Sequence, residues 1–412
     1  MNFFEKYICS TVCILMLSSS VHCMQSEIEE ETVEIRQRDE LRRAYARAKE
    51  WDIKTVIDLP NCRKDILVME FSADKKTILT ECDKRACLFE SETGKLIREF
   101  EGHIGTIIAG AVGAEGKTIV TSSQDKTVRV WNAHTGKVLR QFASHPHLSD
   151  SSLETGEAKN GLTDSLESTG RLWNKDPLRL FKKLFDLIWC VSLSPDERLL
   201  FTGSHDGTAW VWDVESGKPL MQLKGHTETI FSAEIYSCGT RILTASSDGT
   251  ARLWDIKSGN ELMKYSGHTK GINSAVVSPC GTMILTGSGD RTAILWNSET
   301  GKPIRTFIGH IRISCVSLSF DGTIVLTTGY NDKTVRLWDV NTGIYLRQLQ
   351  GPRASILAVA FRSDQMAILA ASGEGSVHSW SRPSVEDTYT EIISSENCYL
   401  DKDTDELGCT LQ

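Results

Sequence analysis

The sequence predicts an all-β fold in which four-stranded blades form a closed ring, a β-propeller. Three observations lead to this prediction. Aromatic residues recur along the chain at a nearly constant spacing, a Gly-His pair recurs at a fixed distance before four of them, and short β-branched runs separated by turn residues lie between the two. A four-stranded blade has two apolar faces that it cannot bury alone, so copies of such a blade stack on one another around a ring.

The aromatic spacing sets the number of copies. Seven tryptophans are separated by 42, 39, 42, 42, 42 and 42 residues, and a phenylalanine lies 42 residues before the first of them. In five copies a histidine lies 28 residues before the tryptophan. Eight copies in phase predict eight blades. The aromatic positions are Phe89, Trp131, Trp173, Trp212, Trp254, Trp296, Trp338 and Trp380, and the histidines are His103, His145, His226, His268 and His310.

One repeat shows how a blade follows from the residues. Between His226 and Trp254 two apolar runs, residues 229–235 and 241–246, are separated by a turn, and Asp248-Gly249 is a strong two-residue hairpin signal before the next strand. The ends of the repeat region predict closure. Residues 53–59 look like a fourth strand without a blade, whereas the last copy, 356–380, has only three strands. We therefore expect the first strand to complete the last blade, which removes exposed sheet edges.

The third copy is degenerate. Residues 145–173 align without a gap with residues 103–131, but Ser149, Asp150 and Glu154 stand where the second copy has isoleucine and valine. We interpret the chain as eight blades with the third degenerate, or as seven blades plus an irregular insert. In either case this segment is expected to be the least stable part of the ring.

These copies resemble the WD-repeat (G-protein β-subunit-like repeat) family over residues 52–382, because Asp or Asn follows most of the tryptophans and the Gly-His pairs keep their distance. The resemblance implies a hydrogen-bonded network of His, Ser or Thr, Asp and Trp inside each blade. A catalytic triad repeated three times would serve no purpose, so we expect a structural role and no enzymatic activity. The network residues are His103, Ser123, Asp125 and Trp131; His226, Ser246, Asp248 and Trp254; and His268, Ser288, Asp290 and Trp296.

The resemblance also implies a contact face. In that family the usual contacts come from two positions near the start of the innermost strand and one position just before the turn Asp. Carried onto this chain, these positions bring Leu187, Trp189, His205 and Phe231 together, and aromatic side chains often dominate interface energetics. The alternative is that Trp189 and Phe231 belong to the core between blades. Further positions on the predicted partner-binding face are Thr229, Ile108, Gln124, Arg312 and Asn331.

The flanks predict a domain order. Residues 1–23 read as a secretory signal peptide, with lipidation of Cys23 as an alternative, and residues 24–51 read as a charged N-terminal helix. The propeller is expected over 52–382, and an acidic, disordered tail over 383–412. A cleaved signal would place the protein in the secreted or periplasmic space with no stable membrane span. The protein would be cytoplasmic if the signal is not used.

Charge and cysteine usage exclude several classes of function. The net charge of −8 argues against non-specific nucleic-acid binding, which needs a basic face. The twelve cysteines include no CxxC pair and no zinc spacing, so no metal and no cofactor are predicted. Cys238 and Cys280 occupy the same turn position in neighbouring repeats, which argues against a disulfide framework.

The function predicted from the sequence is a non-catalytic scaffold that binds a protein or peptide on the propeller face, outside the cytosol. An intracellular adaptor or substrate receptor is the alternative if the signal is not used, and the unpaired cysteines favour it. An envelope assembly factor and an enzyme with a pocket in the central channel are two further alternatives. The innermost strands offer mostly Ile, Ser, Ala, Val and Cys, which disfavours the enzyme.

Overall fold

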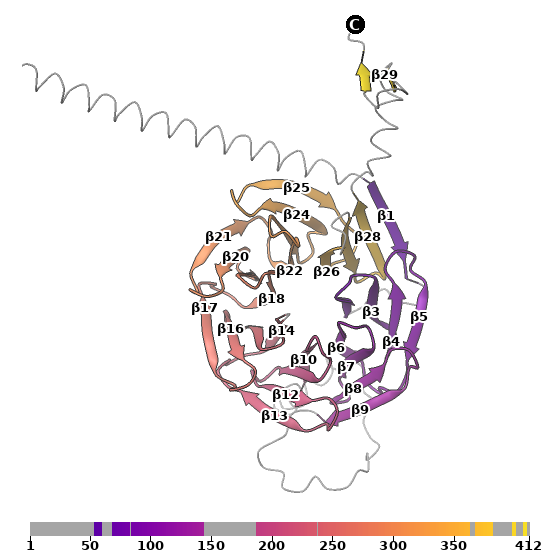
Figure 1. Ribbon diagram of the computed structural model, residues 1–412, viewed down its shortest axis with the longest axis vertical. Coiled ribbons are helices and arrows are strands. Elements are labelled where there is room, and N and C mark those ends of the chain that lie inside the picture. Colours follow the sequence, from indigo (N-terminus) through magenta and orange to yellow (C-terminus); the bar gives the residue numbers. More distant parts are fainter. Residues whose placement is uncertain are drawn as a thin grey trace, which may run out of the picture. The chain divides into compact units, whose positions relative to one another are not determined.

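The computed structural model describes residues 53–59, 68–82, 84–143, 187–236, 238–362 and 367–381, and two short strands near the C-terminus. Within these residues the chain consists of β-strands and turns and contains no helix. Seven four-stranded antiparallel sheets are arranged around a ring (Figure 1). The short strands β29 (Cys398–Leu400) and β30 (Leu407–Cys409) pair only with each other.

Each of the first six blades is built from four consecutive strands, which run in order from the axis of the ring to its rim. Blade 1 consists of β2 (Met69–Phe71), β3 (Thr77–Cys82), β4 (Arg85–Glu90) and β5 (Leu96–Phe100). Blade 2 consists of β6 (Ile107–Val112), β7 (Thr118–Ser123), β8 (Thr127–Asn132) and β9 (Val138–Ala143). Blade 3 consists of β10 (Ile188–Leu193), β11 (Leu199–Ser204), β12 (Ala209–Asp213) and β13 (Pro219–Leu223).

The remaining blades follow the same plan. Blade 4 consists of β14 (Ile230–Ile235), β15 (Arg241–Ser246), β16 (Thr250–Asp255) and β17 (Glu261–Ser266). Blade 5 consists of β18 (Ile272–Val277), β19 (Met283–Ser288), β20 (Thr292–Asn297) and β21 (Pro303–Ile308). Blade 6 consists of β22 (Ile313–Leu318), β23 (Ile324–Gly329), β24 (Thr334–Asp339) and β25 (Tyr345–Gln350). Blade 7 contains β26 (Ile356–Phe361), β27 (Ala367–Ser372) and β28 (Ser376–Ser381).

The burial of the strands explains their composition. The second strand of a blade is covered on both faces by the neighbouring blades, so it is a continuous run of β-branched and small residues; in β23 all six residues are buried. The outermost strand has one covered face, and β21 buries only Phe307. Successive blades share apolar clusters, such as the one that joins Leu243 of blade 4 to Ile284 of blade 5. The core of the molecule is therefore a set of layers between blades.

The prediction of eight blades is wrong, because the described ring contains seven. Blade 2 packs directly on blade 3: Val120 and Ile188 belong to one buried cluster, and Ser122 Oγ donates a hydrogen bond of 3.0 Å to the carbonyl oxygen of Ile188. At the rim, the guanidinium of Arg140 donates to the carbonyl oxygen of Glu215 at 2.8 and 2.9 Å. No blade lies between them.

The third copy was misread because its spacing was given more weight than its composition. Residues 145–173, including Trp173, lie outside the described residues. In the six complete copies the start of the innermost strand is buried, as at Ile107 and Ile230. Ser149 and Asp150 stand at this point in the third copy, and burying them without partners would cost free energy. The signal peptide over 1–23 and the helix predicted over 24–51 also lie outside the described residues, as does most of the tail over 383–412.

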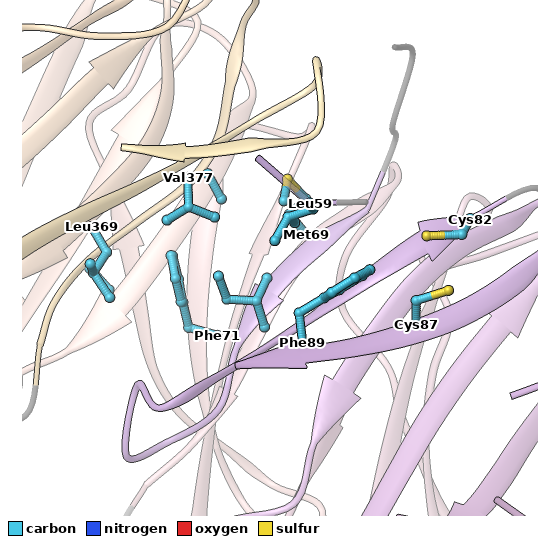
Figure 2. Packing of buried hydrophobic residues seen from close by; sticks show 11 residues of the cluster. Leu59, Met69, Phe71, Cys82, Cys87, Phe89, Leu369 and Val377 are labelled. Atoms are coloured by element: carbon cyan, nitrogen blue, oxygen red, sulfur yellow. The ribbon is translucent and has the colours of Figure 1, made fainter. Parts of the chain in front are cut away.

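The predicted closure of the ring is confirmed. β1 (Ile53–Asp58) pairs antiparallel with β28, with Ile57 opposite Val377, and supplies the fourth strand of blade 7. The amide of Leu59 donates a 2.8 Å hydrogen bond to the carbonyl oxygen of Gly375. Across the seam between blades 7 and 1, Phe71 and Phe89 pack in one buried cluster with Val377 (Figure 2).

The two faces of the ring carry different loops. In blade 6 the ladder places Ile313 opposite Gly329 and Thr334 opposite Gln350, so these four strand ends lie at one edge of the sheet. We call the face with these ends the upper face. It carries the turn between the second and third strand of each blade and the loop that enters the next blade. The lower face carries the other two turns.

Candidate functional site

A chain of hydrogen bonds crosses the interior of blade 2. The Nδ1 atom of His103 lies 2.8 Å from Asp125 Oδ2, and its Nε2 atom lies 2.8 Å from Thr121 Oγ1. Trp131 Nε1 donates to the same threonine oxygen at 2.9 Å. All groups are satisfied if a neutral imidazole donates to the carboxylate and accepts from the threonine hydroxyl, which accepts from the indole. Blades 4 and 5 repeat the chain with the triads His226, Thr244 and Trp254, and His268, Thr286 and Trp296.

The aspartate of this network anchors two loops of the upper face. Asp125 accepts hydrogen bonds from the amide of Ile104, in the loop that enters the blade, and from the amide of Thr127, which begins β8 after the upper turn. Burial alone would raise the pKa of Asp125, but the hydrogen bonds from His103 and Thr127 outweigh it and lower the pKa to about 2. Burial lowers the pKa of His268 against the opposing influence of Asp290. These buried pairs have the geometry of a structural brace inside the blade.

The serines of the predicted network do not lie between histidine and tryptophan, and they bond backbone groups of the upper loops instead. Ser246 Oγ donates to the carbonyl oxygen of Glu228 at 2.9 Å and accepts from the amide of Asp248 at 3.1 Å. Ser123 accepts from the amide of Asp125 in the same way, and Ser288 from that of Asp290. The hydroxyl between histidine and tryptophan comes instead from a threonine two residues earlier in the strand. That threonine was visible in the sequence as a repeated Thr-x-Ser pattern.

Blade 6 has the network with one extra residue in the turn. Thr327 lies eleven positions before Trp338, whereas the corresponding pairs in blades 2, 4 and 5 are ten positions apart. The extra residue gives a turn in which both Asn331 and Lys333 have positive φ, 67° and 58°. His310 bonds Asp332 and Thr327, so the brace is kept despite the longer turn.

A bulge repeats at the start of the innermost strand in blades 2 to 7. In blade 3 Ile188 pairs with Ser204 and Cys190 pairs with Gly203, which leaves Trp189 out of the ladder. Phe231 has the same place in blade 4 and Ile108 in blade 2. A bulge re-aims the side chain of the extra residue, and here it does so next to the upper face. The corresponding residues of blades 5, 6 and 7 are Asn273, Ser314 and Leu357.

Three of the predicted contact residues form an aromatic cluster. The rings of Trp189 and Phe231 are edge to face, with centroids 6.1 Å apart and an interplanar angle of 88°. The ring of His205 lies 6.4 Å from that of Trp189. Trp189 is 36% exposed, and the other two rings are half-buried. We call Trp189, His205 and Phe231 the aromatic cluster.

Of the other predicted contact residues, some are buried beneath the aromatic cluster and some reach the surface elsewhere on the upper face. Leu187 and Thr229 are buried; the Leu187 carbonyl accepts from the His205 amide at 3.0 Å, and Thr229 Oγ1 donates to the His205 carbonyl at 3.0 Å. These two residues hold the aromatic cluster in place. Arg312 and Asn331 are exposed, on blade 6, whereas Ile108 and Gln124 are half-buried on blade 2. The predicted residues therefore share one face, and only three of them are in one cluster.

Comparison with known proteins agrees with this architecture. Residues 187–382 match the family model described as the IFT122 first beta-propeller, and residues 94–132 match the model described as WD domain, G-beta repeat. Both matches lie on the blades described above. The chain belongs to the WD-repeat β-propeller family.

One curated protein is similar to this chain over a short stretch. The chain is 30% identical over 56 residues to the U3 small nucleolar RNA-associated protein 15 homolog of Gallus gallus. The match covers 14% of this chain and 11% of that protein. A match of this length carries no conclusion about the function of this chain.

Two carboxylates on the innermost strands of this WD-repeat ring were missed in the sequence. Glu70 of blade 1 and Glu234 of blade 4 interact electrostatically although they are far apart along the chain. The Glu70 side chain is exposed and that of Glu234 is half-buried, but both lie among the closely spaced innermost strands. Desolvation there raises the pKa of Glu70 to about 6 and that of Glu234 to about 7, while Lys75 acts in the opposite direction on both. The amide of Val277 donates to Glu234 at 2.8 Å. No pattern in the repeats indicates that these two residues face the same axis.

A metal-ligand cluster and a membrane-spanning helix are both absent from the described residues. Among them, no group of three or more His, Cys, Asp and Glu side chains is arranged to hold a metal ion. In the same part of the chain no helix is long and apolar enough to cross a membrane.

Proposed function

We propose that the protein is a non-catalytic scaffold that binds a protein or peptide partner at the aromatic cluster on the upper face. The observation that carries the proposal is the exposed Trp189 ring, packed edge to face on Phe231 and held at a bulge. A large aromatic on a rigid support loses little conformational entropy when it is covered, which favours its use as an anchor.

The buried braces support the assignment of a non-catalytic role. The carboxylates and imidazoles that could pass for catalytic groups, such as His226 and Asp248, are buried and hydrogen-bonded to each other. They organise the loops of the upper face. The face then presents rigid loops and the aromatic cluster, the arrangement expected of a binding surface.

The test compares Trp189→Ala with Leu220→Ala by affinity purification from the native host and then with the purified partner. Leu220 is 54% exposed on the rim strand β13, so it is a matched apolar control away from the face. We expect the Trp189 variant to bind its partner at least about 30-fold more weakly, as for an aromatic hot spot. Equal binding by wild type and both variants would refute the proposed site. Unchanged thermal unfolding of both variants would exclude misfolding.

The compartment of the scaffold is part of the proposal. A signal peptide over 1–23 would export it, and N-terminal sequencing of the mature protein from its host tests this directly. A chain that begins near residue 24 outside the cytosol supports a secreted or periplasmic scaffold. An intact Met1 in the cytosol contradicts export.

An intracellular adaptor is the second candidate, and one observation favours it. The six cysteines whose side chains the structure describes are free thiols, two of them exposed: Cys82, Cys87, Cys190, Cys238, Cys280 and Cys315. Free thiols persist most easily in a reducing compartment. The same sequencing experiment decides between the two candidates.

A further inference from the structure

The upper face carries basic residues at backbone positions that suit glycine. In each blade one residue follows the acidic residue of the upper turn, and in all seven this residue has a left-handed φ between 58° and 80°. It is glycine in three blades, where no side chain is strained by such a φ. In the other four it is always lysine or arginine. The glycines are Gly207, Gly249 and Gly375, and the basic residues are Lys84, Lys126, Arg291 and Lys333.

More basic residues come from the loops that enter blades 5, 6 and 7. Lys270, Arg312 and Arg353 lie in these loops, and all three side chains are exposed. The Arg312 guanidinium lies 5.2 Å from the centre of the Tyr330 ring and donates to Asn273 Oδ1 at 3.4 Å, so its contacts are uncharged. Together with Arg291 and Lys333 these residues form what we call the basic arc, over blades 5 to 7.

The positive charges of the basic arc are not compensated within the described part of the chain. None of its five residues forms an ion pair there, whereas arginines elsewhere in the ring do: Arg85 lies 2.7 Å from Glu99, and Arg362 lies 3.1 Å from Glu92. Of the acidic residues in the upper turns of blades 5 to 7, Asp290 and Asp332 pair with His268 and His310. The third, Glu374, accepts a hydrogen bond of 3.2 Å from the backbone amide of Arg353. A concentration of cations in a chain of net charge −8 favours a partner of opposite charge.

The aromatic cluster lies on a different sector of the same face. Blades 3 and 4 present Asp206 and Glu228 as exposed side chains of their upper loops, next to Trp189 and Phe231. The face is therefore divided into an apolar sector with acidic neighbours and a basic sector. A partner that covers both sectors needs an apolar group and a separate group of negative charges.

From this division we infer that the partner of the upper face is an acidic polypeptide segment, whose carboxylates lie over the basic arc while an apolar side chain reaches the aromatic cluster. The inference rests on the proposed function and adds the chemistry of the partner. A polypeptide fits better than a nucleic acid, because a continuous phosphate backbone would also pass the exposed acids of blades 3 and 4.

The experiment uses the double variant Arg291→Gly/Lys333→Gly. Glycine adopts a left-handed φ without strain, so the variant removes two charges and is expected to keep the thermal stability of the wild type. The matched control is Lys75→Gly, since Lys75 has a φ of 59° in a turn of the lower face. The probes are a fluorescently labelled deca-glutamate peptide and a labelled ten-nucleotide oligothymidylate, titrated at low and at physiological salt.

We expect deca-glutamate to bind the wild type and the control equally, and the double variant at least about tenfold more weakly. Equal affinity for the double variant, no binding of deca-glutamate, or tighter binding of the oligothymidylate would each overturn the inference. Titration of the native partner separates the two proposals. If Trp189→Ala weakens its binding but the double variant does not, the proposed site stands and the acidic partner is refuted. If only the double variant weakens it, the acidic partner stands and the aromatic cluster is refuted.

Discussion

Blades 3 and 4 are neighbours with the same strands, but only blade 4 has the complete brace. In blade 4 Asp248 bonds His226 at 2.8 Å and also accepts from Thr250. In blade 3 Asp206 is exposed and bonds only Thr208 among the residues described, because leucine stands at the position of the histidine. Both blades nevertheless form four strands. The comparison indicates that apolar burial makes the blade and that the polar network fixes its loops.

The largest expected effect comes from removing the carboxylate in the two blades. Asp248→Ala leaves the buried His226 without its carboxylate partner and also removes an exposed hydrogen bond from the amide of Thr227, and we expect a loss of about 3 kcal/mol. Asp206→Ala loses only exposed hydrogen bonds to Thr208 and is expected to cost about 0.5 kcal/mol. Urea unfolding measures the loss in the free energy of unfolding of each variant, and hydrogen exchange shows which blade is destabilised. Equal losses of unfolding free energy in Asp248→Ala and Asp206→Ala would show that the histidine adds nothing to the stability of the blade.

The tryptophan half of the network should behave alike in the two blades. Trp212 Nε1 donates to Thr202 at 2.9 Å, and Trp254 Nε1 donates to Thr244 at 2.8 Å. Replacing either tryptophan by phenylalanine removes this bond and part of a buried ring, and we expect about 2 kcal/mol in both blades. A clearly smaller loss at Trp212 than at Trp254 would show that the histidine strengthens the indole bond.

The two blades also differ on the innermost strand, where Glu234 of blade 4 stands at the position of Ser192 in blade 3. Burial raises the folded-state pKa of Glu234 to about 7, above its usual value, so the folded state binds the proton more tightly than the unfolded state. Stability therefore rises as the pH falls from about 8 to about 5. Glu234→Gln keeps an oxygen for the amide of Val277 and removes the charge. We expect it to stabilise the protein by about 1 kcal/mol at pH 8, a figure reduced for solvent screening, and by little at pH 5.

Thermal unfolding across this pH range checks the prediction. Glu70 and Lys75 interact with Glu234 and also contribute to the pH dependence of stability. Glu70→Gln is therefore the matched control for Glu234→Gln. A wild type and a Glu234→Gln variant with the same pH dependence would contradict the assignment.

The smallest effect is expected in a lower-face turn. Asp196 of blade 3 accepts from Ser194 Oγ at 2.6 Å, and Cys280 of blade 5 takes the same place, 3.4 Å from Ser278 Oγ and 2.9 Å from Thr282 Oγ1. These hydrogen bonds lower the pKa of Cys280 to about 7. Cys280→Asp should change stability by less than about 0.5 kcal/mol.

The thiol itself offers a second measurement in that turn. Near pH 7 about half of Cys280 is thiolate, whereas burial raises the pKa of Cys190 to about 12. Iodoacetamide should therefore label Cys280 much faster than Cys190, as followed by mass spectrometry. Similar labelling rates at the two cysteines would contradict the lowered pKa.

Most of the fold could be predicted from periodic features. The aromatic spacing located the blades, and the unpaired strand at 53–59 predicted the closure with β28. The blade count was wrong because a phased tryptophan was accepted as a blade. The substitutions Ser149, Asp150 and Glu154 already removed the apolar residues that an innermost strand must bury. The loss of buried apolar residues in this copy is stronger evidence on the number of blades than the spacing of its tryptophan.

The candidate site was predictable only in part. Trp189 and Phe231 were predicted because the contact positions of the resembled family fall on them, and the structure shows that both lie at the bulge that recurs in the repeat. Glu70 and Glu234 were missed because their proximity depends on ring closure, which brings distant segments to one axis. The basic arc was missed because no single repeat contains it, and it is recognised only when the turns of several blades are seen on one face.

The pairing of β1 with β28 has a consequence for synthesis on the ribosome. Ile53 of β1 pairs with Ser381 of β28. The first strand of the ring is therefore synthesised long before its pairing partner, and it stays unpaired until nearly the whole ring has been made. Until then, blade 1 has an apolar face exposed at the open end of the growing arc, where Phe71 and Phe89 later meet Val377. The nascent chain is thus an unsealed arc until its last blade emerges, and the first strand of one chain can be captured by the last blade of another.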